Sequence, residues 1–231
     1  MKCLLFVCLA VLVGVAVFAV SGSGQAPALQ KGITVQMASS SHAAPMPEAD
    51  YENAWIVTVT ADGRIYFGTE EVTADGLMEQ MRIHPRNRAA KLYLKADAGA
   101  PFSSVRQVLH AARKDLFDDV VLLTSQPEAT QPGTIVSPKG LDVWIGAEGA
   151  SNPVVVQIAS EEGSTALKVN NEAVAPSELQ TRLGKIFDNR ADRIVVLALS
   201  GQIAYAQIVH AIDASRAAGA SRITLVVATE F

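Results

Sequence analysis

Cysteine is almost absent from this sequence, and its absence excludes several kinds of site. Both cysteines, Cys3 and Cys8, lie in an apolar stretch near the amino-terminal end. The rest of the chain therefore contains no structural disulfide, no zinc ribbon and no cysteine nucleophile. We interpret the two thiols as small hydrophobic groups within that stretch.

An excess of positive charge is also missing. The chain has 19 basic and 23 acidic residues, a formal net charge of -4, and the two signs are interspersed. A nucleic-acid-binding protein needs a basic face to meet phosphate, so we expect no nucleic-acid partner. The four histidines share no metal-ligand spacing. The serines lack the context of a nucleophile elbow, and no glycine-rich loop carries the lysine of a phosphate site. We therefore predict no catalytic site, no metal, no cofactor and no enzyme activity.

Acidic residues are absent from residues 1–47, and the first is Glu48. Within this region the stretch Leu4–Val20 has no polar side chain apart from its cysteine. As a helix it would be about 26 Å long, close to the roughly 30 Å of a bilayer core. We expect residues 1–24 to form a membrane anchor or a signal-like helix, because the following SGSGQAPA leaves cleavage open. Lys2 keeps the short amino end inside, which places the rest of the chain in a bacterial periplasm.

Residues 25–50 are rich in Ala, Ser, Pro and Gly, and we interpret them as a flexible tether. Inside the tether, GITVQM at residues 32–37 alternates apolar and polar side chains. The alternation predicts a short strand with Ile33, Val35 and Met37 on one side. An exposed strand of this kind can add to the edge of another sheet, so these three residues are the candidate partner-binding site.

Residues 51–127 predict a first folded unit of the type ββαβαβ. An Asp62-Gly63 turn is typical of a hairpin, and Thr73 is a candidate helix N-cap. We expect Ser103 or Ser104 to cap the second helix, and a turn to fill residues 68–72. The strands and helices follow from apolar periodicity. The expected strands are Trp55–Val59, Arg64–Phe67, Lys91–Lys95 and Val120–Leu123.

Residues 128–231 repeat this order after a second tether-like strand, GLDVWI at residues 140–145. A shift of 103 residues places Phe102 on Tyr205 and Val120 on Ile223. A period near 100 residues indicates duplicated domains rather than a solenoid. The sequence therefore predicts an α+β protein with one amino-terminal membrane helix and two tandem small domains. The strands expected in the second unit are Val154–Ile158, Ala166–Val169, Ile194–Leu199 and Ile223–Val227, and its helices begin near Pro176 and Ala204.

Three segments resemble the periplasmic domain of the ExbD/TolR family of biopolymer-transport proteins. They are IVTVTADGRIYFGTEEVTADGL at residues 56–77, KLYLKAD at residues 91–97, and YAQIVHAIDASRAAGASRITLV at residues 205–226. The resemblance implies a single-pass subunit of the bacterial inner membrane with its carboxy-terminal domains in the periplasm. It also implies a multi-span partner of the ExbB/TolQ type, use of the proton motive force, and a TonB/TolA-like or cell-wall partner.

One departure from the family pattern concerns ion coupling. The family carries an aspartate within its membrane helix, which here would fall near Val13, and no acid stands there. The chain is then a degenerate or accessory subunit, or its start is misassigned. A secreted periplasmic binding module that has lost the motor role is the alternative. The duplication also leaves open whether the chain forms a homo-dimer or an internal pseudo-dimer.

Overall fold

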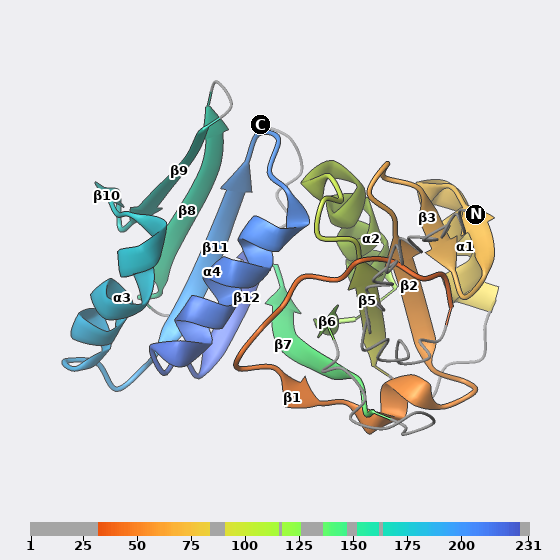
Figure 1. Ribbon diagram of the computed structural model, residues 1–231, viewed down its shortest axis with the longest axis horizontal. Coiled ribbons are helices and arrows are strands. Elements are labelled where there is room, and N and C mark those ends of the chain that lie inside the picture. The colour runs from red at the N-terminus through yellow and green to blue at the C-terminus, as the bar shows by residue number, and fades with distance from the viewer. Residues whose placement is uncertain are drawn as a thin grey trace, which may run out of the picture.

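A computed structural model of the chain describes residues 32–83, 91–115, 117–125, 136–146, 152–161 and 164–226. Within these residues the protein is α+β, with one mixed sheet of twelve strands and four α-helices (Figure 1). The expected helix of residues 1–24 lies outside the described part of the chain. None of the described helices is long and apolar enough to cross a membrane.

The first half of the chain forms the expected hairpin and helices, with one added strand. Gly63, at a φ of 84°, donates its amide to Thr60 across the predicted turn, and Thr73 caps α1 by accepting the amide of Gly76 at 3.1 Å. A short strand, β4, occupies part of the region expected to be only a turn. The elements are β1 Ala44–Pro45, the 3-10 helix η1 Pro47–Asp50, β2 Trp55–Val59, β3 Ile65–Phe67, β4 Glu70–Val72, α1 Ala74–Ile83, β5 Leu92–Ala96, α2 Phe102–Lys114 and β6 Asp119–Thr124.

The second half repeats the same order of elements after β7. Here the expected helix near Pro176 begins as a short 3-10 turn, η2, that leads into α3. The last helix begins at Tyr205, one residue later than expected. The elements are β7 Lys139–Ile145, β8 Val154–Glu161, β9 Ser164–Val169, β10 Glu172–Ala173, η2 Pro176–Glu178, α3 Leu179–Phe187, β11 Ile194–Ser200, α4 Tyr205–Ala217 and β12 Arg222–Val226.

The strands of both halves belong to one continuous sheet. Its order is β10-β9-β8-β11-β12-β7-β6-β5-β2-β3-β4, so the neighbour relations within one half are those of the other. Strand β7 joins the halves, because it pairs antiparallel with β6 over six residue pairs and parallel with β12. The two units expected from the sequence are therefore fused through a shared sheet rather than separated by a free linker (Figure 1).

The helix starts of the two halves also meet each other directly. The amide of Phe102 donates to the carbonyl of Ile203 at 2.9 Å, and the amide of Tyr205 donates to the carbonyl of Ala100 at 2.9 Å. Each residue and its counterpart are 103 positions apart, so the two bonds exchange when one half is mapped onto the other. This reciprocity is the geometry of a pseudo-twofold axis. It also corrects the expected cap of α2: the helix begins at Phe102, whose amide is satisfied by the other half rather than by a serine.

One hydrophobic core fills the side of the sheet on which the helices pack, and we call this side the inner face. It contains buried residues of all four helices and the alternate residues of the central strands, such as Leu94, Leu122, Val143, Leu197 and Leu225. A second, smaller cluster lies on the opposite, outer face. It consists of Met46, Ala49, Ile56, Tyr93, Val121 and Leu123. The segment that leads from the tether into β2 therefore covers the outer face of the first half.

Candidate functional site

The tether, which is the candidate partner-binding segment, is folded back against the chain's own domains. The three predicted site residues alternate in exposure with their neighbours: Val35 is 9% exposed, Ile33 and Met37 are half-buried, and Thr34 and Gln36 are exposed. Residues 32–37 were expected to form a strand, but the structure gives only one antiparallel bridge, between Met37 and Asp97. The tether therefore keeps the side-chain alternation of a strand, but it makes few of the backbone contacts by which strands pair.

Asp97 holds the tether at the end of β5. Its carboxylate accepts the backbone amide of Gln36 at 3.0 Å and that of Gly99 at 2.9 Å, and the amide of Ala98 donates to the carbonyl of Gln36 at 2.7 Å. Further on, the amide of Ser125 at the end of β6 donates to the carbonyl of Ala38 at 2.8 Å. The tether thus crosses the carboxyl ends of two neighbouring strands, held by backbone bonds and by the Asp97 carboxylate.

Asp213 on α4 fixes the tether to the second half of the chain. Its carboxylate accepts the hydroxyl of Ser40 and the amide of His42 at 2.9 Å, and the Nδ1 atom of His42 lies 3.3 Å from the same oxygen. Burial by itself raises the pKa of Asp213, but the hydrogen bonds from Ser40 and His42 outweigh it and lower the pKa below the ordinary value. Asp213 therefore ties the tether to the second half, as Asp97 ties it to the first.

Two buried polar residues face each other on the outer face of β2 and β5. Thr58 and Lys95 are register partners, and they are 0% and 1% exposed. The hydroxyl of Thr58 has no hydrogen-bond partner among the described residues. Desolvation lowers the pKa of Lys95 to about 8. Gly32 lies directly above, because a Cβ at that position would be 3.8 Å from the Thr58 hydroxyl. The start of the tether therefore lies over buried polar groups, and burial of polar groups costs free energy.

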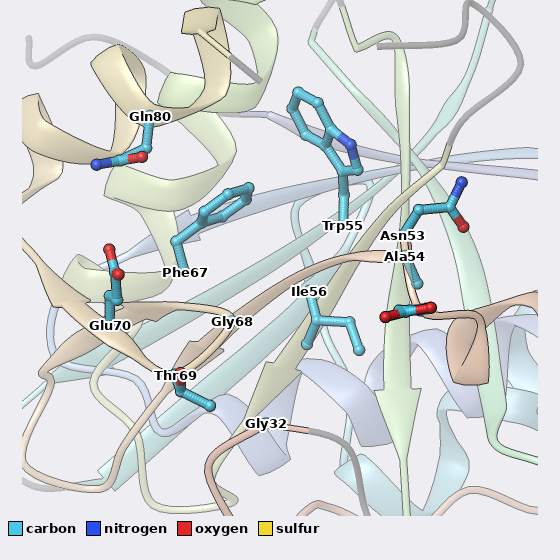
Figure 2. Close-up of a pocket in the computed structure, with 11 residues that line it drawn as sticks. Gly32, Asn53, Ala54, Trp55, Ile56, Phe67, Gly68, Thr69, Glu70 and Gln80 are labelled. Carbon is cyan, nitrogen blue, oxygen red and sulfur yellow. The ribbon is translucent and has the colours of Figure 1, made fainter. Parts of the chain in front are cut away.

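A pocket of about 580 Å³ opens beside the start of the tether. Its walls include Trp55 and Phe67, whose rings meet edge to face with centroids 5.8 Å apart. Figure 2 shows both rings extending to the same side of the sheet, toward the helix that carries Gln80, whereas Ile56 points to the opposite side. The polar side chains of the lining are those of Glu52, Asn53, Thr69, Glu70 and Gln80, and Gly32 of the tether also lines the pocket.

The chemistry of these groups suits contact with another protein. The tether offers backbone amides and an apolar side, and the pocket offers aromatic walls with carboxylates around them. Across the described ranges, no three histidine, cysteine, aspartate or glutamate side chains are grouped to hold a metal ion. The sequence analysis singled out neither Asp97 nor Asp213 as a functional residue. Asp213 contacts residues more than 170 positions away, which no local pattern indicates.

Comparison with known proteins identifies the family. The profile of the family described as "Biopolymer transport protein ExbD/TolR" matches residues 4–127, which is just over half of the chain. The match covers the apolar stretch Leu4–Val20, the tether and the first half, and it ends before β7. No curated protein and no solved structure matches the chain. Proteins of this family are inner-membrane subunits of biopolymer-transport systems that transduce energy. The chain belongs to the ExbD/TolR family of biopolymer transport proteins.

Proposed function

We propose that this chain is a membrane-anchored subunit of a proton-gradient-linked envelope complex, and that it works by protein contact rather than catalysis. Its partners are a multi-span membrane protein of the ExbB/TolQ type and a periplasmic TonB/TolA-like or cell-wall partner. Residues 1–24 anchor it in the inner membrane with a single pass, and the sheet lies in the periplasm. The family match supports this assignment, because it begins at residue 4 within the apolar stretch.

The tether is the element that contacts the partner. Gln36 uses both its amide and its carbonyl to pair with the end of β5. Because alternate residues of an extended chain direct their backbone groups to opposite sides, the amides of Val35 and Met37 face the other edge. That edge can pair with a partner strand, while release from Asp97 and Asp213 makes the apolar side of Ile33, Val35 and Met37 accessible. The buried Thr58 hydroxyl, which lies beside Gly32 at the start of the tether, favours release, because it regains water when the tether lifts.

The second half is a second copy of the family domain, and the two copies form an internal pseudo-dimer. The repeated strand order and the reciprocal bonds at Phe102 and Tyr205 support this reading. One chain then takes the place of two single-domain subunits.

Proton transfer by this chain's own membrane helix has no support, because residues 1–47 contain no acid. A carboxylate within a membrane helix normally marks ion coupling. We infer that another subunit of the complex supplies that carboxylate, and that this chain acts beside it as an accessory subunit.

Affinity purification from native membranes tests the assignment. The full-length chain with a carboxy-terminal tag is extracted in mild detergent, and all co-purifying proteins are identified by mass spectrometry. Recovery of a multi-span ExbB/TolQ-like protein is the expected result. Recovery of the chain alone, shortened at its front as after signal cleavage, would support the secreted binding module instead.

A matched pair of tether variants tests the mechanism in the same assay. Val35→Pro removes an amide from the free edge of the tether, and we expect it to lose the periplasmic partner. Gln36→Pro removes the amide bonded to Asp97, so it loosens the tether and leaves that free edge intact. Binding of the partner by Gln36→Pro should equal or exceed that of the wild type. Equal partner recovery with both variants would contradict the role of the tether.

A further inference from the structure

The carboxylate of Glu70, in the lining of the pocket beside the tether, has a counterpart in the second half of the chain. Strands β3 and β4 pair Phe67 with Glu70, and strands β9 and β10 pair Val169 with Glu172 in the same way. Each glutamate follows a two-residue turn and precedes a helix that packs on the inner face of the sheet. Glu172 therefore stands in the second half where Glu70 stands in the first.

In the second half, an arginine of the same chain pairs with this carboxylate. Arg182 on α3 forms an ion pair and a hydrogen bond with Glu172. The two helices align through their buried residues, because Leu77 of α1 and Leu179 of α3 are both buried and are 102 positions apart. The same shift places Gln80 on Arg182. The first half therefore has a neutral side chain where the second half has a guanidinium.

Glu70 lacks the cation that its counterpart has. Among the described residues, neither Glu70 nor Glu52, which lines the same pocket, forms an ion pair, whereas the adjacent Glu71 pairs with Arg64 at 3.6 Å. The half-buried Phe67 also lines the pocket, and Figure 2 shows Glu70 and Gln80 at the same end of the pocket as the Phe67 ring. A guanidinium suits this combination, because it pairs with carboxylates through two parallel hydrogen bonds and also stacks on aromatic rings.

We propose that the pocket binds an arginine side chain of the periplasmic partner protein, with its guanidinium at Glu70 and against the Phe67 ring. The pair of Arg182 and Glu172 supports the choice of arginine, since it is the contact that this carboxylate position makes in the other half. Gly32, at the start of the tether, lines the same pocket. The inference therefore rests on the proposed function and deepens it: a partner strand along the tether lies next to the pocket.

The peptide acetyl-Ala-Arg-Ala-amide serves as the probe, and the full-length chain is held in lipid nanodiscs. The chain has two tryptophans, so isotopic labelling of tryptophan gives two indole signals in an NMR spectrum. Trp55 lines the pocket, whereas Trp144 lies on β7 and serves as an internal reference. We expect a saturable shift of the Trp55 signal with the Trp144 signal unchanged. The same peptide with citrulline, the neutral isostere of arginine, should bind about fivefold more weakly.

Three variants locate the site. Glu70→Gln should weaken binding of the arginine peptide by about fivefold, whereas Glu71→Gln, which removes a carboxylate that already pairs with Arg64, should leave binding unchanged. Gln80→Arg copies the arrangement of the second half, so the new guanidinium should pair with Glu70 and abolish binding. Because Gln80 is a partly exposed helix residue, the fold should be kept, and an unchanged urea midpoint of unfolding checks this.

Several results would overturn the proposal. They are the absence of a saturable Trp55 shift, equal binding of the arginine and citrulline peptides, and equal binding by Glu70→Gln and Glu71→Gln. Arg86 and Arg88 lie outside the described residues. Peptide binding that occurs in the double variant Arg86→Gln, Arg88→Gln but not in the wild type would also overturn the proposal, and would assign the pocket to an arginine of this chain.

The outcome is separable from that of the proposed function. Peptide binding at Glu70 without recovery of a multi-span partner from native membranes would keep the arginine site and contradict the transport assignment. Recovery of that partner, together with an unchanged Trp55 signal, would do the reverse.

Discussion

Replacement of Lys95 by methionine should stabilise the protein at neutral pH, by an amount that falls as the pH rises. The lysine is 1% exposed, and desolvation lowers its pKa from 10.5 to about 8. A shift of that size corresponds to roughly 3 kcal/mol, at about 1.4 kcal/mol per pKa unit. Below pH 8 the amine is protonated in both the folded and the unfolded chain, and the folded state bears the free-energy cost that the lowered pKa expresses.

The sign of the pH dependence follows from linkage. Between pH 8 and pH 10.5 the unfolded chain binds the proton and the folded chain does not, so wild-type stability rises with pH. Above pH 10.5 both states are neutral at this position and the cost disappears. Lys95→Met has no such group, so its advantage over the wild type should shrink by about 3 kcal/mol between pH 7 and pH 11. Any change in packing adds an offset that does not depend on pH.

Urea denaturation, followed by circular dichroism at several pH values, measures this difference. Thr58→Val is the matched control, because it removes a buried polar group from the register partner of Lys95 without removing a titrating one. It should stabilise the protein by about 1 kcal/mol at every pH, since the Thr58 hydroxyl is buried with no partner among the described residues. A Lys95→Met difference that stayed constant within about 1 kcal/mol across this pH range would refute the reasoning.

Two further substitutions test the contacts between the halves. Tyr205 is fully buried, and its hydroxyl has no partner in the part of the chain that the structure describes. Its counterpart in the first half is Phe102, which has no hydroxyl. Tyr205→Phe should therefore raise the free energy of unfolding, measured by urea denaturation, by about 1–2 kcal/mol. A clear loss of stability would mean that the hydroxyl is paired. Asp213→Asn should weaken the tether contact by about 1–2 kcal/mol and accelerate hydrogen exchange at the His42 amide. Because the pKa of Asp213 is lowered in the folded chain, acid should loosen the tether in the same way only below pH 3.8, as the carboxylate becomes protonated. If hydrogen exchange at the His42 amide is unchanged in Asp213→Asn, the tether is held by other contacts.

The proposed internal pseudo-dimer has consequences for how such a subunit is assembled. Two separate chains related by a twofold axis would each contribute a tether, but only one strand fits between β6 and β12, and here it is β7. The first tether takes a different path, over Asp97 and onto Asp213. In the proposed pseudo-dimer the two tethers are therefore unequal: one is a fixed part of the sheet, and the other is held by a few bonds that can break.

The sequence determined most of the local structure. Alternation and helical periodicity predicted the strands and helices of both halves, because side-chain burial repeats every two residues in a strand and about every 3.6 in a helix. The turn at Gly63 and the cap at Thr73 were predicted for the same reason, since both depend on residues a few positions apart. The order of elements also carried the family resemblance, and the family match confirms it for residues 4–127.

Tertiary structure alone decided how these elements meet. Pairing of β7 with both β6 and β12 depends on backbone groups, which every residue carries, so the sequence does not mark the partner strand. The start of α2 was misplaced because the amide of Phe102 is satisfied by Ile203, a residue from the other half. The roles of Asp97 and Asp213 arise from the same kind of distant contact. Composition and periodicity fixed which side of each strand is buried, whereas the folded chain decided which segment, if any, covers the other side.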